Sequence, residues 1–124
     1  MFKCAIGYSG IYDIGLYGRA NFLSEIGSPE HVERFVGDPQ RELEDLSPTA
    51  HAMSIEAAVL LIHGGKDKIA PKEHALRMRD ALAKAGRAPE WYYVDYEAHG
   101  FYDTENQVEV YRRLESFLAK HIGR

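Results

Sequence analysis

The sequence has little of what disulfide-bonded, membrane-spanning or secreted proteins need. Its single cysteine, Cys4, excludes an internal disulfide and gives no support to a cysteine-based metal site. Its longest apolar run, residues 57–62, is far shorter than the roughly 18 residues that cross a bilayer. The N-terminus also lacks the charged and then apolar layout of a signal peptide. We therefore expect no membrane association and a cytoplasmic location.

An excess of positive charge is missing as well. The formal net charge is -4 at pH 7, so the chain has no basic footprint for nucleic acid or anionic lipid. It contains no phosphate-binding GxxxxGK[ST] loop and no compact histidine spacing typical of zinc sites, and we expect neither cofactor nor metal. The 124 residues fit one globular domain.

Three short apolar segments predict β-strands, at residues 2–8, 57–65 and 90–97. The second contains a continuous apolar run, which is typical of a strand covered on both faces. Helical patterns separate these segments, and that alternation indicates βαβ units around a parallel sheet. The predicted fold class is α/β, with about three parallel strands and flanking helices.

Helix signals lie between the first and second predicted strands and between the second and third. Ser28-Pro29 and Asp38-Pro39 each predict the start of a short helix within residues 29–45. Residues 71–86 predict a longer helix that ends at Gly86. Its apolar face consists of Ala75, Met78, Leu82 and Ala85.

The last helix is expected to begin at Thr104, because Thr104-x-x-Gln107 matches a capping box. Apolar residues recur along it with helical spacing. The predicted buried stripe consists of Val110, Leu114, Phe117, Leu118 and either His121 or Ile122.

Two polar residues follow the predicted strands at the edge where parallel sheets carry their chemistry. Asp67 lies in "HGGKDKIAP" after the second strand, and His99 lies in "EAHGFYD" after the third. A carboxylate on one loop can fix the tautomer of an imidazole on the next, so we expect the two side chains within hydrogen-bonding reach. The alternative is that Asp67 caps the following helix and His99 is a solvent-exposed turn residue.

A family resemblance rests on the same residues. "VLLIHGGKDKIAP" followed by "ALAKAGRAPEWYYVDYEAHGF" resembles the C-terminal part of the catalytic domain of the prolyl oligopeptidase family, which has the α/β-hydrolase fold. The resemblance extends upstream to "FKCAIGYSGIYD" and so covers nearly the whole chain. It implies that residues 1–124 are a partial catalytic domain of a three-layer hydrolase. It also implies that Asp67 is the acid and His99 the base of a catalytic triad.

Ser9 is the obvious candidate nucleophile, but its surroundings do not match one. A nucleophile elbow reads G-x-S-x-G, whereas Gly10 follows Ser9 directly. The next residues carry no clean helical pattern, which an elbow also requires. The resemblance places the nucleophile upstream of Met1, together with the oxyanion donors. His63 precedes two glycines, as in the oxyanion loops of some esterases, but it follows the wrong strand and we expect it to be structural.

The resemblance implies a serine hydrolase that transfers the acyl group of a peptide or ester to water. This chain would supply Asp67 and His99 without the nucleophile, so we expect it to be inactive alone. Two alternatives remain: a non-catalytic truncated module that folds and self-associates, and a small esterase that uses Ser9.

The resemblance also bears on assembly. In the family, the strand that corresponds to residues 2–8 has a neighbour supplied by the nucleophile segment. Without that neighbour the strand would present unpaired backbone groups and apolar surface. We therefore expect a homodimer or higher homo-oligomer through the first strand.

Overall fold

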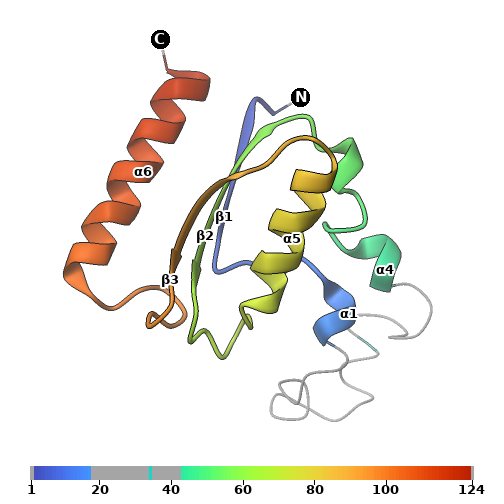
Figure 1. The fold of residues 1–124 in the computed structure, drawn as a ribbon, viewed down its shortest axis with the longest axis horizontal. Coiled ribbons are helices and arrows are strands. Elements are labelled where there is room, and N and C mark those ends of the chain that lie inside the picture. The colour runs from blue at the N-terminus through green and yellow to red at the C-terminus, as the bar shows by residue number, and fades with distance from the viewer. Residues whose placement is uncertain (1, 18–33, 35–42, 124) are drawn as a thin grey trace.

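Three parallel strands form one sheet in the computed structural model, which describes residues 2–17, 34 and 43–123 (Figure 1). They are β1 (Cys4–Tyr8), β2 (Ala58–Gly64) and β3 (Glu90–Val94), in the order β1-β2-β3. Both strand pairs are parallel, so all three strands end at the same edge of the sheet. This arrangement confirms the predicted α/β fold with three parallel strands.

Helices cover both faces of the sheet, which gives the three layers visible in Figure 1. On one face, Val59 and Leu61 of β2 pack with residues of α5 (Glu73–Lys84) and of the short helix η1 (Ala52–Ser54). On the other face, Leu60 and Ile62 pack with α6 (Thr104–Ile122). A strand covered on both faces needs apolar side chains on both, which explains the continuous apolar run in β2. Each fully buried apolar side chain contributes about 1.5–3 kcal/mol to the free energy of unfolding, relative to an exposed one.

Helix α5 agrees with the prediction from the sequence. Ala75, Met78 and Leu82 are buried, while Ala85 lies just beyond the helix as its C-cap. Gly86 has a φ of +74°, a conformation that side chains with a Cβ rarely adopt. Its N–H donates to the Ala83 carbonyl (3.0 Å), and the N–H of Arg87 donates to the Leu82 carbonyl (2.9 Å). These two bonds form a Schellman motif, which confirms Gly86 as the stop signal.

Helix α6 begins at Thr104 as predicted, but its N-cap differs from the prediction. The N-cap is Asp103, whose carboxylate accepts hydrogen bonds from the backbone N–H groups of Glu105 and Asn106. The capping box between Thr104 and Gln107 is therefore wrong. The N-cap lies one residue earlier, and the Gln107 N–H, which the Thr104 side chain would have capped, donates to the Asp103 carbonyl (2.9 Å). Gln107 instead donates its side-chain N–H to the Phe101 carbonyl (2.9 Å).

The buried stripe of α6 is narrower than predicted. Val110 and Phe117 are buried, and Leu114 packs against the same cluster. Of the two alternatives at the end of the helix, His121 is correct, since its ring lies 4.5 Å from that of Phe117. Leu118 does not belong to the stripe, because it lies about 100° around the helix from Phe117 and is 37% exposed.

Other expectations fall on segments that the structure covers only in part. The starts at Ser28-Pro29 and Asp38-Pro39 lie outside the described residues. Two short helices, α1 (Ile14–Tyr17) and α4 (Leu43–Leu46), flank that stretch. None of the helices in the described part of the chain is long and apolar enough to cross a membrane.

Candidate active site

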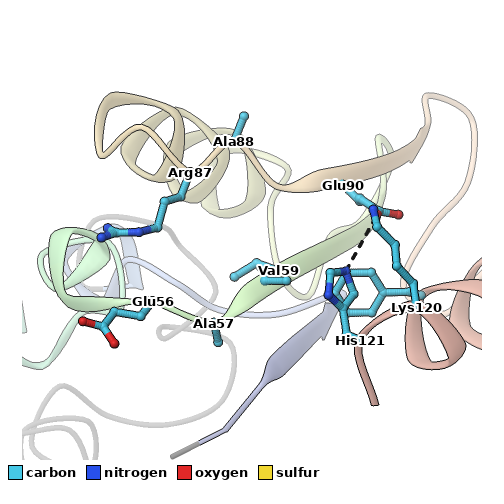
Figure 2. A pocket seen from close by; sticks show the side chains of 10 residues that line it. Glu56, Ala57, Val59, Arg87, Ala88, Glu90, Lys120 and His121 are labelled. Atoms are coloured by element: carbon cyan, nitrogen blue, oxygen red, sulfur yellow. Dashed lines mark hydrogen bonds and ion pairs between the residues drawn. The ribbon is translucent and has the colours of Figure 1, made fainter. Parts of the chain in front are cut away.

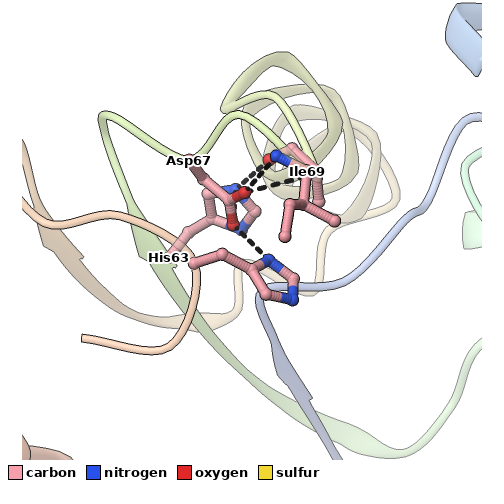
Figure 3. Close-up of polar contacts among 5 residues, drawn as sticks. His63, Asp67 and Ile69 are labelled. Atoms are coloured by element: carbon pink, nitrogen blue, oxygen red, sulfur yellow. Dashed lines mark hydrogen bonds and ion pairs between the residues drawn. The ribbon is translucent and has the colours of Figure 1, made fainter. Parts of the chain in front are cut away.

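Asp67 lies in the turn that follows β2, and its side chain is completely buried. One carboxylate oxygen, Oδ1, accepts hydrogen bonds from the backbone N–H groups of Ile69 (2.9 Å) and Ala70 (2.8 Å) (Figure 3). These bonds close a tight turn around the side chain. They leave the other oxygen, Oδ2, available to a partner outside the turn.

That partner is His99, which lies in the turn after β3. Its Nδ1 is 2.9 Å from Asp67 Oδ2, so the structure brings the two predicted residues within hydrogen-bonding distance as expected (Figure 3). A carboxylate only accepts hydrogen bonds, so Nδ1 carries the proton and Nε2 keeps a free lone pair. The His99 side chain is 39% exposed. A buried carboxylate thus orients an accessible imidazole.

Two glycines allow the acid loop to approach the base loop so closely. The N–H of Gly65 donates to the Val94 carbonyl (2.9 Å), and the N–H of Lys66 donates to the Glu97 carbonyl (2.8 Å). A Cβ on Gly64 would lie 2.4 Å from the Ala98 carbonyl oxygen, and one on Gly65 would meet backbone equally closely. The Gly-Gly pair of the sequence motif is therefore required to bring Asp67 and His99 together.

Glu97 is a residue of this site to which the sequence analysis gave no role. It is 3% exposed and sits two residues before His99. Its Oε2 accepts from the Tyr102 N–H (2.8 Å), and its Oε1 accepts from the Asp103 N–H (3.0 Å) and the Asn106 side chain (2.8 Å). The carboxylate therefore closes the loop that carries His99. The signal in the sequence was an acidic residue directly before the turn at residues 98–100.

The ionisation of Glu97 follows from these contacts. Burial by itself raises the pKa of the carboxyl group, but the hydrogen bonds from Asn106, Tyr102, Asp103 and Ala98 outweigh burial. They hold the pKa of Glu97 below its ordinary value of 4.5. The loop also contains two residues with positive φ, Gly100 (+91°) and Phe101 (+39°), and the charged carboxylate helps to hold that conformation.

Ser9 lies at the end of β1, and the structure does not bring it to His99. Its N–H donates to the Ile62 carbonyl (2.9 Å), and its φ is +49°. Its Oγ is buried and has no hydrogen-bond partner within the described residues. The next helix, α1, begins only at Ile14, whereas an elbow serine starts its helix directly.

His63 is fully buried at the end of β2, and its Nε2 lies 2.8 Å from the Ala70 carbonyl. The sequence predicted a structural role for His63 but not its place beside Asp67, whose Oδ2 is 3.7 Å away. In residues 2–17, 34 and 43–123, no group of three or more His, Cys, Asp or Glu side chains is arranged to hold a metal ion.

A pocket of about 310 Å³ lies at the other end of the sheet, at the start of β2 and β3 (Figure 2). Val59, Arg87 and His121 contribute to its lining. Its lysine, Lys120, is already paired with Glu90 at 2.8 Å. The pocket is separated from Asp67 and His99 by the length of the strands and is not part of the candidate site.

Comparisons with known proteins identify the family and the fold of the chain. The model of the prolyl oligopeptidase family matches residues 1–124. No curated protein matches the chain. A puromycin-hydrolyzing peptidase of Mycobacterium tuberculosis is 27% identical over 98% of this chain, with a TM-score of 0.80, and the match covers 19% of that protein.

Two further solved structures share the fold at lower identity. An acylaminoacyl peptidase of Pyrococcus horikoshii is 24% identical over 99% of this chain, with a TM-score of 0.82 and 20% of that protein covered. Dipeptidyl peptidase 4 of Porphyromonas gingivalis is 18% identical over 98% of this chain, with a TM-score of 0.78 and 16% covered. The chain thus spans about a fifth or less of the length of these structures. With its family match over every residue and its three-layer fold, the chain belongs to the prolyl oligopeptidase family.

Proposed function

We propose that residues 1–124 supply the acid, Asp67, and the base, His99, of a serine hydrolase site whose nucleophile comes from outside these residues. The observation that carries the proposal is the 2.9 Å hydrogen bond between Asp67 Oδ2 and His99 Nδ1, made by a buried carboxylate and an accessible imidazole. The family match over residues 1–124 supports a hydrolase of this type.

In the first half of the proposed reaction, the serine oxygen attacks the carbonyl carbon of a peptide or ester. His99 Nε2 takes the serine proton, and Asp67 stabilises the imidazolium that forms. His99 then gives this proton to the leaving amine or alcohol as the bond from the carbonyl carbon to that group breaks. The product of this half is an acyl-serine.

In the second half, a water molecule attacks the acyl carbon and gives a proton to His99 Nε2. The bond between the acyl carbon and the serine oxygen breaks, and His99 returns the proton to that oxygen. A carboxylic acid leaves, and the serine and the neutral imidazole are restored. Asp67 keeps Nδ1 protonated throughout, so that Nε2 is always the atom that exchanges protons.

The isolated chain is expected to show negligible hydrolase activity, because the proposal places both the nucleophile and the oxyanion donors outside residues 1–124. A fluorophosphonate probe measures this directly, since it labels activated serines. We expect no stoichiometric labelling of Ser9, whose buried hydroxyl has no hydrogen-bond partner, basic or otherwise, in the part of the chain that the structure describes. Stoichiometric labelling that disappears in Ser9→Ala would instead support an esterase that uses Ser9.

The positive arm of the same experiment supplies the missing parts. Residues 1–124 replace the matching part of the puromycin-hydrolyzing peptidase, which is 27% identical. The chimera is expected to hydrolyse a peptide p-nitroanilide and to be labelled at the serine of its other segment. A folded chimera without turnover would contradict the proposed roles of Asp67 and His99.

We also propose that the chain associates through β1. The Lys3 carbonyl and the Ser9 N–H both bond to β2, so the intervening even-numbered residues direct their backbone groups to the opposite edge of β1. This edge pairs with no strand in the part of the chain that the structure describes, and it is called the open edge below. Apolar side chains on the strand and beside it are exposed: Phe2 at 88%, Ile6 at 37% and Tyr8 at 39%. A second copy can pair antiparallel with this edge about a two-fold axis.

Light scattering after size-exclusion chromatography is expected to give twice the chain mass of 14.0 kDa. Ile6→Pro removes a donor from the open edge, and Ile6→Lys places a charge there, so both should shift the protein towards monomer. Val108→Lys on α6 changes an apolar residue of similar exposure away from β1, so it should leave the oligomeric state unchanged. A wild-type monomer at every concentration would refute pairing through β1.

A further inference from the structure

His63 is a buried titratable residue that the proposed reaction does not use. It occupies the end of β2, four residues before Asp67, and both side chains are completely buried. Its Nε2 lies 2.8 Å from the Ala70 carbonyl oxygen and 3.7 Å from Asp67 Oδ2 (Figure 3). The same edge of the imidazole therefore faces two oxygen atoms.

The contact with Ala70 assigns the proton on this ring. A carbonyl oxygen only accepts, so His63 Nε2 is the donor and carries the hydrogen. The other nitrogen, Nδ1, is buried and makes no hydrogen bond to the described residues. The polar interactions of the ring that the structure describes are thus all made by its Nε2–H edge.

Ala70 connects His63 to the acid. Its N–H donates to Asp67 Oδ1 (2.8 Å), and its carbonyl accepts from His63 (2.8 Å). The chain of contacts continues from Asp67 Oδ2 to His99 Nδ1. His63 therefore restrains the turn that orients one oxygen of Asp67, while its N–H edge faces the other oxygen.

From this geometry we propose that His63 is a positioning residue, which holds the Asp67 carboxylate in the orientation that bonds His99 Nδ1. The inference deepens the proposed function and rests on it. Without the Nε2–H donor, the Ala70 carbonyl would be buried without its partner, and the turn would relax to find another. The carboxylate would then move relative to His99. Displacements of about 1 Å in such sites cost roughly 10²-fold in rate.

Two substitutions separate the hydrogen bond from simple packing. His63→Met fills a similar volume but has no donor. His63→Gln keeps an N–H donor at about the position of Nε2. Leu82→Ala is the matched control, because Leu82 is equally buried in the α5 layer and is not a member of the chain of contacts from His63 to His99. It reports what a loss of core stability does by itself.

The readout is the tautomer of His99, measured in the full chain from the ¹⁵N shifts of its imidazole at alkaline pH. We expect the Nδ1–H form in wild type, in His63→Gln and in Leu82→Ala, and a shift to the Nε2–H form, which free imidazole side chains favour, in His63→Met. In the chimera, His63→Met should lower kcat roughly 10²-fold with a smaller change in KM, and His63→Gln should restore most of it.

The outcomes distinguish the two proposals. If wild type has the Nδ1–H form and His63→Met keeps it, or if His63→Gln behaves like His63→Met, the positioning role is wrong and the proposed function stands. If wild type itself lacks the Nδ1–H form, the bond between Asp67 and His99 is absent, and both proposals fail. If His63→Met does not fold, an unchanged kcat in the folded His63→Gln supports the role, and a roughly 10²-fold loss overturns it.

Discussion

Replacing His99 with alanine in the chimera is expected to lower kcat about 10⁶-fold, because the serine then has no base and the leaving group no acid. Asp67→Asn is expected to cost about 10⁴-fold, since an amide can donate to Nδ1 and hold the imidazole in the wrong tautomer. The structure motivates both values through the 2.9 Å bond between Asp67 Oδ2 and His99 Nδ1. Steady-state hydrolysis of a peptide p-nitroanilide measures them.

The control for this pair is His51→Ala. His51 is an exposed histidine that contacts the Asp45 backbone carbonyl and takes no part in the candidate site, so turnover should not change. KM should also change little in all three variants, because the lost interactions belong to the transition state. Full activity of folded His99→Ala would show that another group is the base.

Glu97→Gln is expected to destabilise the chain by about 2–3 kcal/mol at neutral pH. The amide nitrogen of glutamine would face either the Tyr102 N–H or the Asp103 N–H and the Asn106 amide, all of which are donors. A donor would thus meet a donor in a buried site. Urea unfolding monitored by circular dichroism gives the difference in the free energy of unfolding.

The pH dependence follows from the depressed pKa of Glu97. A carboxyl group with a folded-state pKa below its ordinary 4.5 contributes stability above pH 4.5, and this contribution is lost as pH falls through the folded-state value. Wild type should therefore lose stability more steeply in acid than Glu97→Gln, and the gap between them should narrow below pH 4.5.

Glu90→Gln provides the matched control, because Glu90 is 45% exposed and pairs with Lys120 on the surface. Such surface pairs contribute about 0–1 kcal/mol to stability, so the free energy of unfolding of Glu90→Gln should be close to that of wild type. If Glu97→Gln were no less stable than Glu90→Gln at neutral pH, the carboxylate of Glu97 would not be what holds the His99 loop together.

Local patterns predicted the elements well. The continuous apolar run of β2 corresponds to a strand covered by α5 on one face and α6 on the other. Gly86 ends α5 because a glycine readily adopts the left-handed backbone conformation that a helix stop needs, and this is a property of the residue itself. Both signals are carried by residues close together in the sequence.

Two predictions for α6 failed: the side chain that caps its first turn and the set of side chains that face the sheet. Asp103 caps α6 in place of Thr104, and that choice depends on the path of the preceding turn. Leu118 has the same apolar character as Leu114, but only Leu114 faces the sheet. The rotation of α6 about its own axis decides which leucine is buried, and that rotation depends on the contacts of the whole layer with the sheet.

By itself the sequence determined the three strands, the long helices and the loops that carry Asp67 and His99, because periodicity and turn residues act over short distances along the chain. Only the tertiary structure decided that Glu97 closes the His99 loop, that Gly64 lets the loops touch and that His63 lies beside Asp67. These contacts join groups brought together by the parallel sheet. The reason is that a hydrogen bond between two loops forms or fails with a change of a few tenths of an ångström in the donor–acceptor distance. The spacing of residues along the sequence does not specify distances that finely.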